Sequence, residues 1–271
     1  MNWTGSIRLT SVLKKGRTIV KDSYHEGAFK LSRPVFLDGT SPTYFLIHVG
    51  GGYVGGDCYQ QYFCLEEGAQ LTLTTQSATK VYKTIDKPAR QETEMILRKG
   101  SFLTYVQDPL IAYEGARYIQ DTTIHMDSGS GILLTDMFTP GWSESRKDFT
   151  YDWIRSKMNV FYGGKRLIMD HLLLQPSDQM ESILLMEGYS HYGSLLFIHD
   201  ELSEDIIREL EEALSGLGKR ARIGFSRLPI RGLMLRVLAN QTQLIEKVFA
   251  VCEDLLRSRV LHKDVVFYRK Y

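Results

Sequence analysis

The chain has 271 residues and a nearly balanced charge, with 33 Lys and Arg against 32 Asp and Glu and a formal net charge of +1. This length allows one large domain with an extensive core, and the charge balance argues against a nucleic-acid platform, which normally shows a basic excess. Three cysteines, Cys58, Cys64 and Cys252, do not make a disulfide framework and favour a reducing compartment. No apolar run approaches the length of a bilayer span, and no hydrophobic signal core is found near residue 1, so we expect a cytoplasmic protein.

The first 198 residues are predicted to be rich in β-strands. Residues 6–13 alternate between polar and apolar side chains, as a half-buried strand does. Further segments with strand character are 44–49, 71–74, 93–97, 102–106, 117–126, 131–135 and 159–162. Turn signals rich in Gly, Pro and Asp separate them. Short strands with regular turns are compatible with a sandwich or a β-helix.

The pattern changes near His199. Ser203 followed by two acidic residues is a typical helix N-terminus, and apolar residues at helical spacing predict helices near 203–217 and 240–261. Two strands are predicted between these helices, at 221–226 and 232–239. We therefore expect a single domain over residues 1–271, with a β-rich body at 1–198 and a small α+β portion at 199–271.

A glycine-rich turn follows the strand predicted at 44–49. Five glycines between positions 50 and 56 satisfy the spacing G-x-G-x-x-G, and Asp57 follows them directly. A dinucleotide site needs a helix to begin at such a turn, yet residues 58–64 are rich in strand formers. The glycines therefore indicate a tight turn with positive φ angles or close backbone approaches. Asp57 either caps this turn or presents its carboxylate to a ligand.

Four sequence blocks together are specific enough to indicate a family. They read GGGYVGGD, TTQSATKVY, DPLIAYEGARY and RGLMLRVLANQ, in that order along the chain. On these residues the chain resembles the urease accessory protein D family, also called H in some organisms, over essentially its whole length. It departs from the family pattern where Gln107 and Ala112 replace two prolines, and at 141–146, where GWSESR differs from the block G-R-x-x-x-G-E-x-F.

This resemblance implies a scaffold without catalytic activity of its own. Members of the family bind urease apoprotein and the accessory proteins F and G; F bridges to G, a GTPase that carries nickel. It also implies a mainly β fold, a β-helix-like stack of strands in two layers, with a small α+β portion that carries two helices near the C-terminus. The family is further associated with a water-filled passage suggested as a nickel route.

The resemblance places the candidates for a transient nickel passage at four positions: Asp57, Ser77, Glu144 and Asp170. Carboxylates and hydroxyls suit transient binding of a borderline divalent cation, whereas imidazole or thiolate would hold it more tightly. We expect no tightly bound cofactor and only transient Ni²⁺. The seven histidines are widely spaced, with no H-x-x-x-H pair, and His171 and His191 are interpreted as ordinary surface or core residues.

Two further expectations concern the surface and an alternative function. Part of the contact with the F protein is expected in the C-terminal segment, at Arg231, Arg236 and Asn240. The alternative is a carbohydrate-active enzyme on a β-helix or sandwich, with an acid/base pair drawn from Asp57, Asp108 and Glu144. The lack of a signal peptide argues against this alternative, because polysaccharide enzymes are usually secreted.

Overall fold

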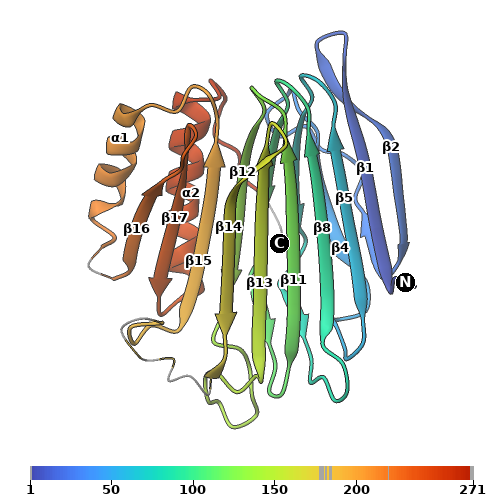
Figure 1. The fold of residues 1–271 in the computed structure, drawn as a ribbon, viewed down its shortest axis with the longest axis vertical. Helices are drawn as coiled ribbons and strands as arrows, with labels where there is room; N and C mark the ends of the chain where they lie inside the picture. The colour runs from blue at the N-terminus through green and yellow to red at the C-terminus, as the bar shows by residue number, and fades with distance from the viewer. Residues whose placement is uncertain (1, 177–179, 181, 183–184, 219, 269–271) are drawn as a thin grey trace.

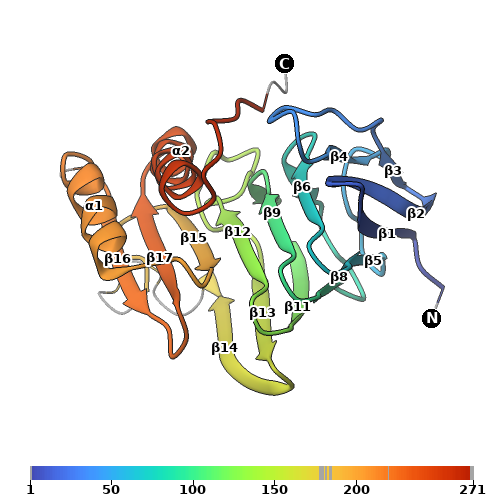
Figure 2. The same ribbon diagram turned by 90° about the horizontal axis from the view of Figure 1, so that it is seen from above.

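The strands form two sheets that lie face to face in a computed structural model describing residues 2–176, 180, 182, 185–218 and 220–268 (Figure 1, Figure 2). The first sheet has the order β14 (Lys165–Leu174), β13 (Trp153–Tyr162), β11 (Arg117–Met126), β8 (Ala89–Leu97), β5 (Cys58–Leu65), β1 (Gly5–Lys14) and β2 (Arg17–Gly27). The second has the order β16 (Arg222–Arg227), β17 (Gly232–Ala239), β15 (His191–Ile198), β12 (Gly131–Phe138), β9 (Phe102–Val106), β6 (Gln70–Thr75), β4 (Thr43–His48) and β3 (Phe29–Leu31). Two short strands, β7 (Thr79–Val81) and β10 (Leu110–Ala112), pair with each other in parallel, and β10 also pairs with β12.

The chain winds as a solenoid through the middle of these sheets. It passes from β5 to β6, from β8 to β9 and from β11 to β12, so that each coil supplies one strand to each sheet. Within each sheet, the strands of successive coils pair in parallel. The prediction of a mainly β, β-helix-like stack in two layers is therefore confirmed.

Parallel register stacks equivalent residues of successive coils on top of one another. On the first sheet, Phe63, Met95, Ile124 and Val160 are neighbours by register, and all four are buried. Together with apolar side chains from the second sheet they form the core between the layers. Each fully buried side chain of this kind contributes about 1.5–3 kcal/mol to stability, so this core accounts for the close approach of the two sheets.

The C-terminal portion places two helices on the outer face of the second sheet (Figure 2). Helices α1 (Glu204–Ser215) and α2 (Thr242–Arg259) cover β15 and β17 and enclose a second core that includes Leu210, Ile245 and Val248. The Ser203 side chain caps α1 by accepting a hydrogen bond from the amide of Ile206. Both predicted helices are thus confirmed, and neither is long and apolar enough to cross a membrane, nor is any other helix of the described residues.

The glycine-rich turn connects β4 to β5. Gly50, Gly51, Gly52 and Gly56 have positive φ angles, and a Cβ at Gly52 would lie 2.7 Å from the carbonyl oxygen of Lys80. The turn therefore requires glycine both for its dihedral angles and for a close backbone contact. It leads directly into strand β5, which confirms that no helix begins there to receive a pyrophosphate.

Candidate functional site

A row of polar side chains, here called the polar file, runs through the interior between the two sheets. Parallel register places Gln91 beside Gln120 and Gln120 beside Ser156, while Gln61 lies beside Thr93. The three glutamines are only 3–6% exposed. Burial of an amide without a partner is costly, and each of these side chains bonds to hydroxyl groups around it, Gln120 also to the carboxylate of Asp136.

The wider part of this polar interior is a cavity of about 350 Å³ beside the glycine-rich turn, which we call the first cavity. Tyr53 donates a hydrogen bond to Gln91 Oε1 at 2.7 Å, and Tyr105 donates one to Gln61 Oε1 at 3.0 Å. Other residues that line it include His48, Ser77, Thr79, Lys80 and Gln107. Its wall therefore includes hydroxyl, amide and imidazole groups, with Lys80 beside them.

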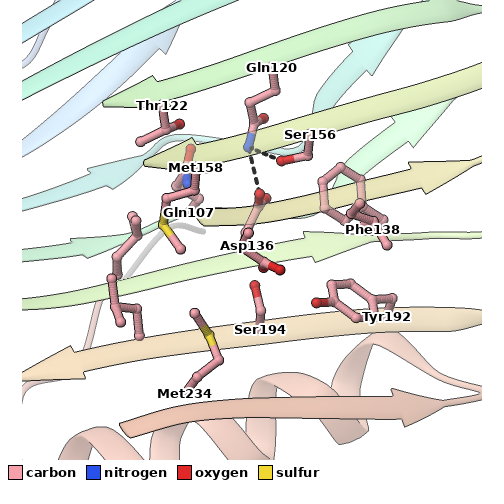
Figure 3. A pocket seen from close by; sticks show the side chains of 14 residues that line it. Gln107, Gln120, Thr122, Asp136, Phe138, Ser156, Met158, Tyr192, Ser194 and Met234 are labelled. Carbon is pink, nitrogen blue, oxygen red and sulfur yellow. Dashed lines mark hydrogen bonds between the residues drawn. The ribbon is translucent and has the colours of Figure 1, made fainter. Parts of the chain in front are cut away.

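A smaller cavity of about 40 Å³, the second cavity, surrounds Asp136 (Figure 3). Gln120 donates a hydrogen bond through Nε2 to Asp136 Oδ2 at 2.5 Å, and the amide of Met137 donates one to Oδ1 at 3.0 Å. Burial raises the pKa of Asp136 to about 7, because these two neutral donors compensate only in part for the lost solvation. Among the described residues, no Lys or Arg forms an ion pair with Asp136.

Gln107 contributes to the walls of both cavities. Its amide group donates to the carbonyl oxygen of Thr135 at 3.0 Å, and its backbone amide donates to the hydroxyl of the same residue at 3.2 Å. These bonds fix Gln107 in the wall that the two cavities share. Polar side chains thus line the two cavities from the glycine-rich turn to the region of β13, β14 and β15.

The four predicted passage residues occupy different positions relative to this file. Ser77 lines the first cavity, and Asp170 on β14 lines the second. Asp57 lines neither of these cavities; it accepts hydrogen bonds from the amide of Val54 at 2.8 Å and from the hydroxyls of Thr4 and Tyr59. It therefore caps the glycine-rich turn, which is one of the two roles that the sequence suggested for it.

Glu144 is exposed in the connection between β12 and β13 and is absent from the linings of both cavities. The third carboxylate of the carbohydrate-enzyme alternative, Asp108, accepts a hydrogen bond from the Thr75 hydroxyl at 2.8 Å. Asp57, Asp108 and Glu144 line no common cavity among those of the described residues.

The residues expected to contact the F protein lie along β17 and its ends. Arg236 forms an ion pair with Asp170 at 2.7 Å, which brings together two residues predicted for different roles. Arg231 donates a hydrogen bond to the carbonyl oxygen of Asp200, and Asn240 Oδ1 accepts one from the amide of Ser190 at 3.0 Å. Their contact with a partner stays a prediction.

Sequence reasoning missed the residues that form most of the polar file. A signal for two of them lies in the sequence of β8: Met95 and Leu97 are apolar and buried, and strand alternation puts Gln91 and Thr93 on the same inward face. His48 was one of several scattered histidines, and Asp136 stood inside an apolar strand. An inward polar residue on consecutive strands is therefore the pattern that could have located this site.

The donor groups of the file suit a species in transit. The described residues contain no group of three or more His, Cys, Asp and Glu side chains that could hold a metal ion. The file instead offers amide oxygens, hydroxyls, one imidazole and two carboxylates spaced along it. Separated ligands of this kind can each contribute one or two bonds to a hydrated divalent cation without enclosing it.

These features define a two-layered β-solenoid protein whose core contains a file of polar side chains and two cavities along it. The family model described as UreD urease accessory protein matches residues 4–270. The chain is 44% identical over 271 residues to the urease accessory protein UreD of Bacillus sp. (strain TB-90), with 100% of both chains covered. It is 38% identical to that of Lachnoclostridium phytofermentans, with 100% of this chain and 99% of the relative covered. The chain therefore belongs to the UreD family of urease accessory proteins, as its sequence blocks indicated.

Proposed function

We propose that this protein acts in the cytoplasm as a scaffold for urease maturation and provides a passage for nickel. In this role it binds urease apoprotein together with the accessory proteins F and G, and it has no catalytic activity of its own. Membership of a family of urease accessory proteins supports the link to urease. The observation that carries the passage is the buried polar file, because a solenoid core needs no glutamines for its stability.

The chemistry of the file fits a hydrated Ni²⁺ ion as cargo. Amide and hydroxyl oxygens can replace some of the water molecules around the ion, yet they bind a borderline cation weakly enough to release it. The carboxylate of Asp136 is the negative charge that the narrow part of the file offers to a cation. Asp170, which lines the same cavity, is already paired with Arg236. The passage therefore attracts the ion at one point and does not trap it in a cage.

Substitution of Gln107 tests the passage directly. A phenylalanine at this position fills the junction of the two cavities and removes the amide group. We expect Gln107→Phe to assemble with the urease subunits and the accessory proteins, but to lower urease activation by roughly 10-fold or more, since the wall loses both its width and its ligand. The measurements are urease activity in co-expressing cells, the nickel content of purified urease, and co-purification of the partners.

A matched control uses the same substitution on the outer face. Gln60 lies on β5 and is half-buried, and its side chain bonds to Ser6 and Arg8 outside the core between the sheets. Gln60→Phe should activate urease as the wild type does. Full activation by Gln107→Phe would remove the passage from the mechanism, and loss of the complex in this variant would assign Gln107 a structural role.

A further inference from the structure

His48 is the one histidine that borders the first cavity among the described residues. Its imidazole bonds to Tyr59, which in turn bonds to Asp57. We propose that His48 captures the nickel ion through Nδ1, and that Tyr59 and Asp57 fix its imidazole in the tautomer that leaves this nitrogen free. This inference rests on the proposed passage and names the residue at which the metal first binds. Asp57, predicted as a ligand, becomes a positioning residue.

The tautomer follows from the directions of the hydrogen bonds. Tyr59 donates its single hydroxyl proton to Asp57 Oδ2 at 3.1 Å, and the distance from Tyr59 Oη to His48 Nε2 is 3.0 Å. Because that proton is already used, the bond to His48 forms only if Nε2 carries the proton and donates it to the tyrosine oxygen. Nδ1 is then unprotonated and keeps its lone pair for a metal.

Asp57 is itself fixed as an acceptor. The amide of Val54 donates to its Oδ2 at 2.8 Å, and the hydroxyl of Thr4 donates to its Oδ1 at 3.2 Å. The carboxylate therefore cannot turn away from Tyr59 without losing a turn cap. A carboxylate that orients a metal-binding histidine through a hydrogen-bond chain is the usual support for such a ligand.

The imidazole ring is also held in place by its neighbours. Its centroid lies 5.0 Å from that of Tyr53, 5.2 Å from that of Tyr59 and 5.9 Å from that of Phe29, each in an edge-on arrangement. A Cβ at Gly50 would lie 3.3 Å from His48 Cε1 and 4.0 Å from each ring nitrogen, so the glycine leaves space beside this edge of the ring. The aromatic groups fix the ring, and the glycine of the turn adds no side chain against it.

The position of the imidazole ring predicts the order in which groups along the passage bind the ion. Imidazole binds a borderline cation such as Ni²⁺ more tightly than a neutral oxygen does. One imidazole at the wide, turn-side cavity can therefore take the ion from solution or from a partner. The amides of Gln61 and Gln91 line the same cavity and can accept it next. Since a single nitrogen holds the ion, it is also released readily.

The proposal is tested with the purified full-length chain and Ni²⁺ alone as the probe. The ¹⁵N shifts of labelled histidine side chains report the tautomer, and we expect His48 to carry its proton on Nε2. We expect Ni²⁺ to bind with roughly 10-fold or greater loss of affinity in His48→Gln, and a similar loss in Tyr59→Phe together with a shift of the tautomer. The matched control is His191→Gln, since His191 is half-buried, bonds to Ser190 and lies outside both cavities.

Three results would each overturn the inference: a proton on Nδ1 of His48 in the wild type, unchanged Ni²⁺ affinity in a folded His48→Gln variant, or unchanged tautomer and affinity in Tyr59→Phe. Circular dichroism establishes folding, and Tyr59→Phe keeps the test open if His48→Gln does not fold.

The proposed passage and the proposed capture of the ion by His48 can be disproved independently. If Gln107→Phe activates urease while the His48 results hold, the passage is wrong and the metal site stands. If Gln107→Phe blocks activation while His48→Gln binds Ni²⁺ normally, the metal site at His48 is wrong and the passage stands.

Discussion

Asp136 is a carboxyl group that the fold keeps partly protonated at neutral pH. Burial raises its pKa to about 7, against the opposing hydrogen bonds from Gln120 and Met137. The nearby charged groups that face it are Asp170, which raises the pKa further, and the Arg236 guanidinium, which is paired with Asp170. The charge of the passage therefore becomes more negative as the pH rises through about 7, and its attraction for a cation becomes stronger.

This raised pKa also predicts how stability depends on pH. The folded protein holds the Asp136 proton more tightly than the unfolded chain does, so the resulting stabilisation is complete below about pH 4 and is lost as the pH rises to about 7. We expect Asp136→Asn to remove this part of the pH dependence, which amounts to about 3 kcal/mol in the free energy of unfolding. Urea unfolding at pH 5 and pH 8 measures it.

The control for this measurement is Asp22→Asn, since Asp22 is exposed on β2. It should follow the wild-type dependence on pH. If Asp136→Asn and the wild type lost stability in parallel between pH 5 and pH 8, the carboxyl group would be ionised throughout that range, and its assigned environment would be wrong.

Strands and helices were predictable from the sequence because their patterns are local. The alternation at 117–126 and the helical spacing of apolar residues after Ser203 each reflect one element and its buried face. The polar file was not predictable in this way, since Gln61, Thr93 and Thr122 become neighbours only through the register of three coils. The coils differ in length, so no fixed period in the sequence reveals that register.

The segment that follows α2 is fastened to the connection between β3 and β4. Arg257 on α2 and Lys263 beyond it both bind Asp38, and the side chains of Arg257 and Asp38 are only 2% and 6% exposed. Burial alone would raise the pKa of the Asp38 carboxyl, but hydrogen bonds from Ser41, Lys263 and Thr40 hold it well below its usual range. These charges link parts of the chain that are far apart in sequence.

Removal of Arg257 should therefore be strongly destabilising. The Arg257→Ala variant leaves the buried carboxylate with a single cation, and loss of one member of a buried pair typically costs about 3–5 kcal/mol in the free energy of unfolding. Urea unfolding measures the difference. As a control, Arg208→Ala removes the exposed pair with Asp205, whose side chains are 67% and 77% exposed, and should change stability by less than about 1 kcal/mol. Equal effects of the two substitutions would contradict the structural role assigned to the buried pair.

The solenoid as a whole exposes apolar and aromatic side chains beside the glycine-rich turn. Tyr82, Tyr113 and Trp142 form an aromatic row, with centroid separations of 4.7 Å and 4.9 Å. Tyr82 donates a hydrogen bond to the carbonyl oxygen of Gly51, which lines the first cavity, so the row begins at the cavity. Ile85, 76% exposed, lies beside the same turn, since a Cβ at Gly55 would lie 3.4 Å from its backbone nitrogen. A surface of this kind is typical of a protein that works within an assembly, and we expect a partner to cover it.

The isolated chain should therefore self-associate through this surface, and charge placed there should prevent it. We expect the double variant Ile85→Lys/Trp142→Lys to remain monomeric at concentrations where the wild type aggregates, because two exposed apolar groups are replaced by solvated cations. Its free energy of unfolding should change by no more than about 0.5 kcal/mol, as for other surface substitutions. Light scattering and urea unfolding measure the two quantities.

A matched double variant separates this surface from exposed apolar area in general. Leu13 and Ile19 lie on the β1–β2 hairpin and are 48% and 39% exposed. Leu13→Lys/Ile19→Lys should leave assembly with urease and the accessory proteins intact, whereas Ile85→Lys/Trp142→Lys should weaken it in pull-down experiments. The same pull-down decides the case: if both variants assembled equally well, the partner would bind elsewhere, and the cavity beside the glycine-rich turn would stay open to solvent in the complex. If only Ile85→Lys/Trp142→Lys fails to assemble, the partner lies where it can pass an ion directly to His48.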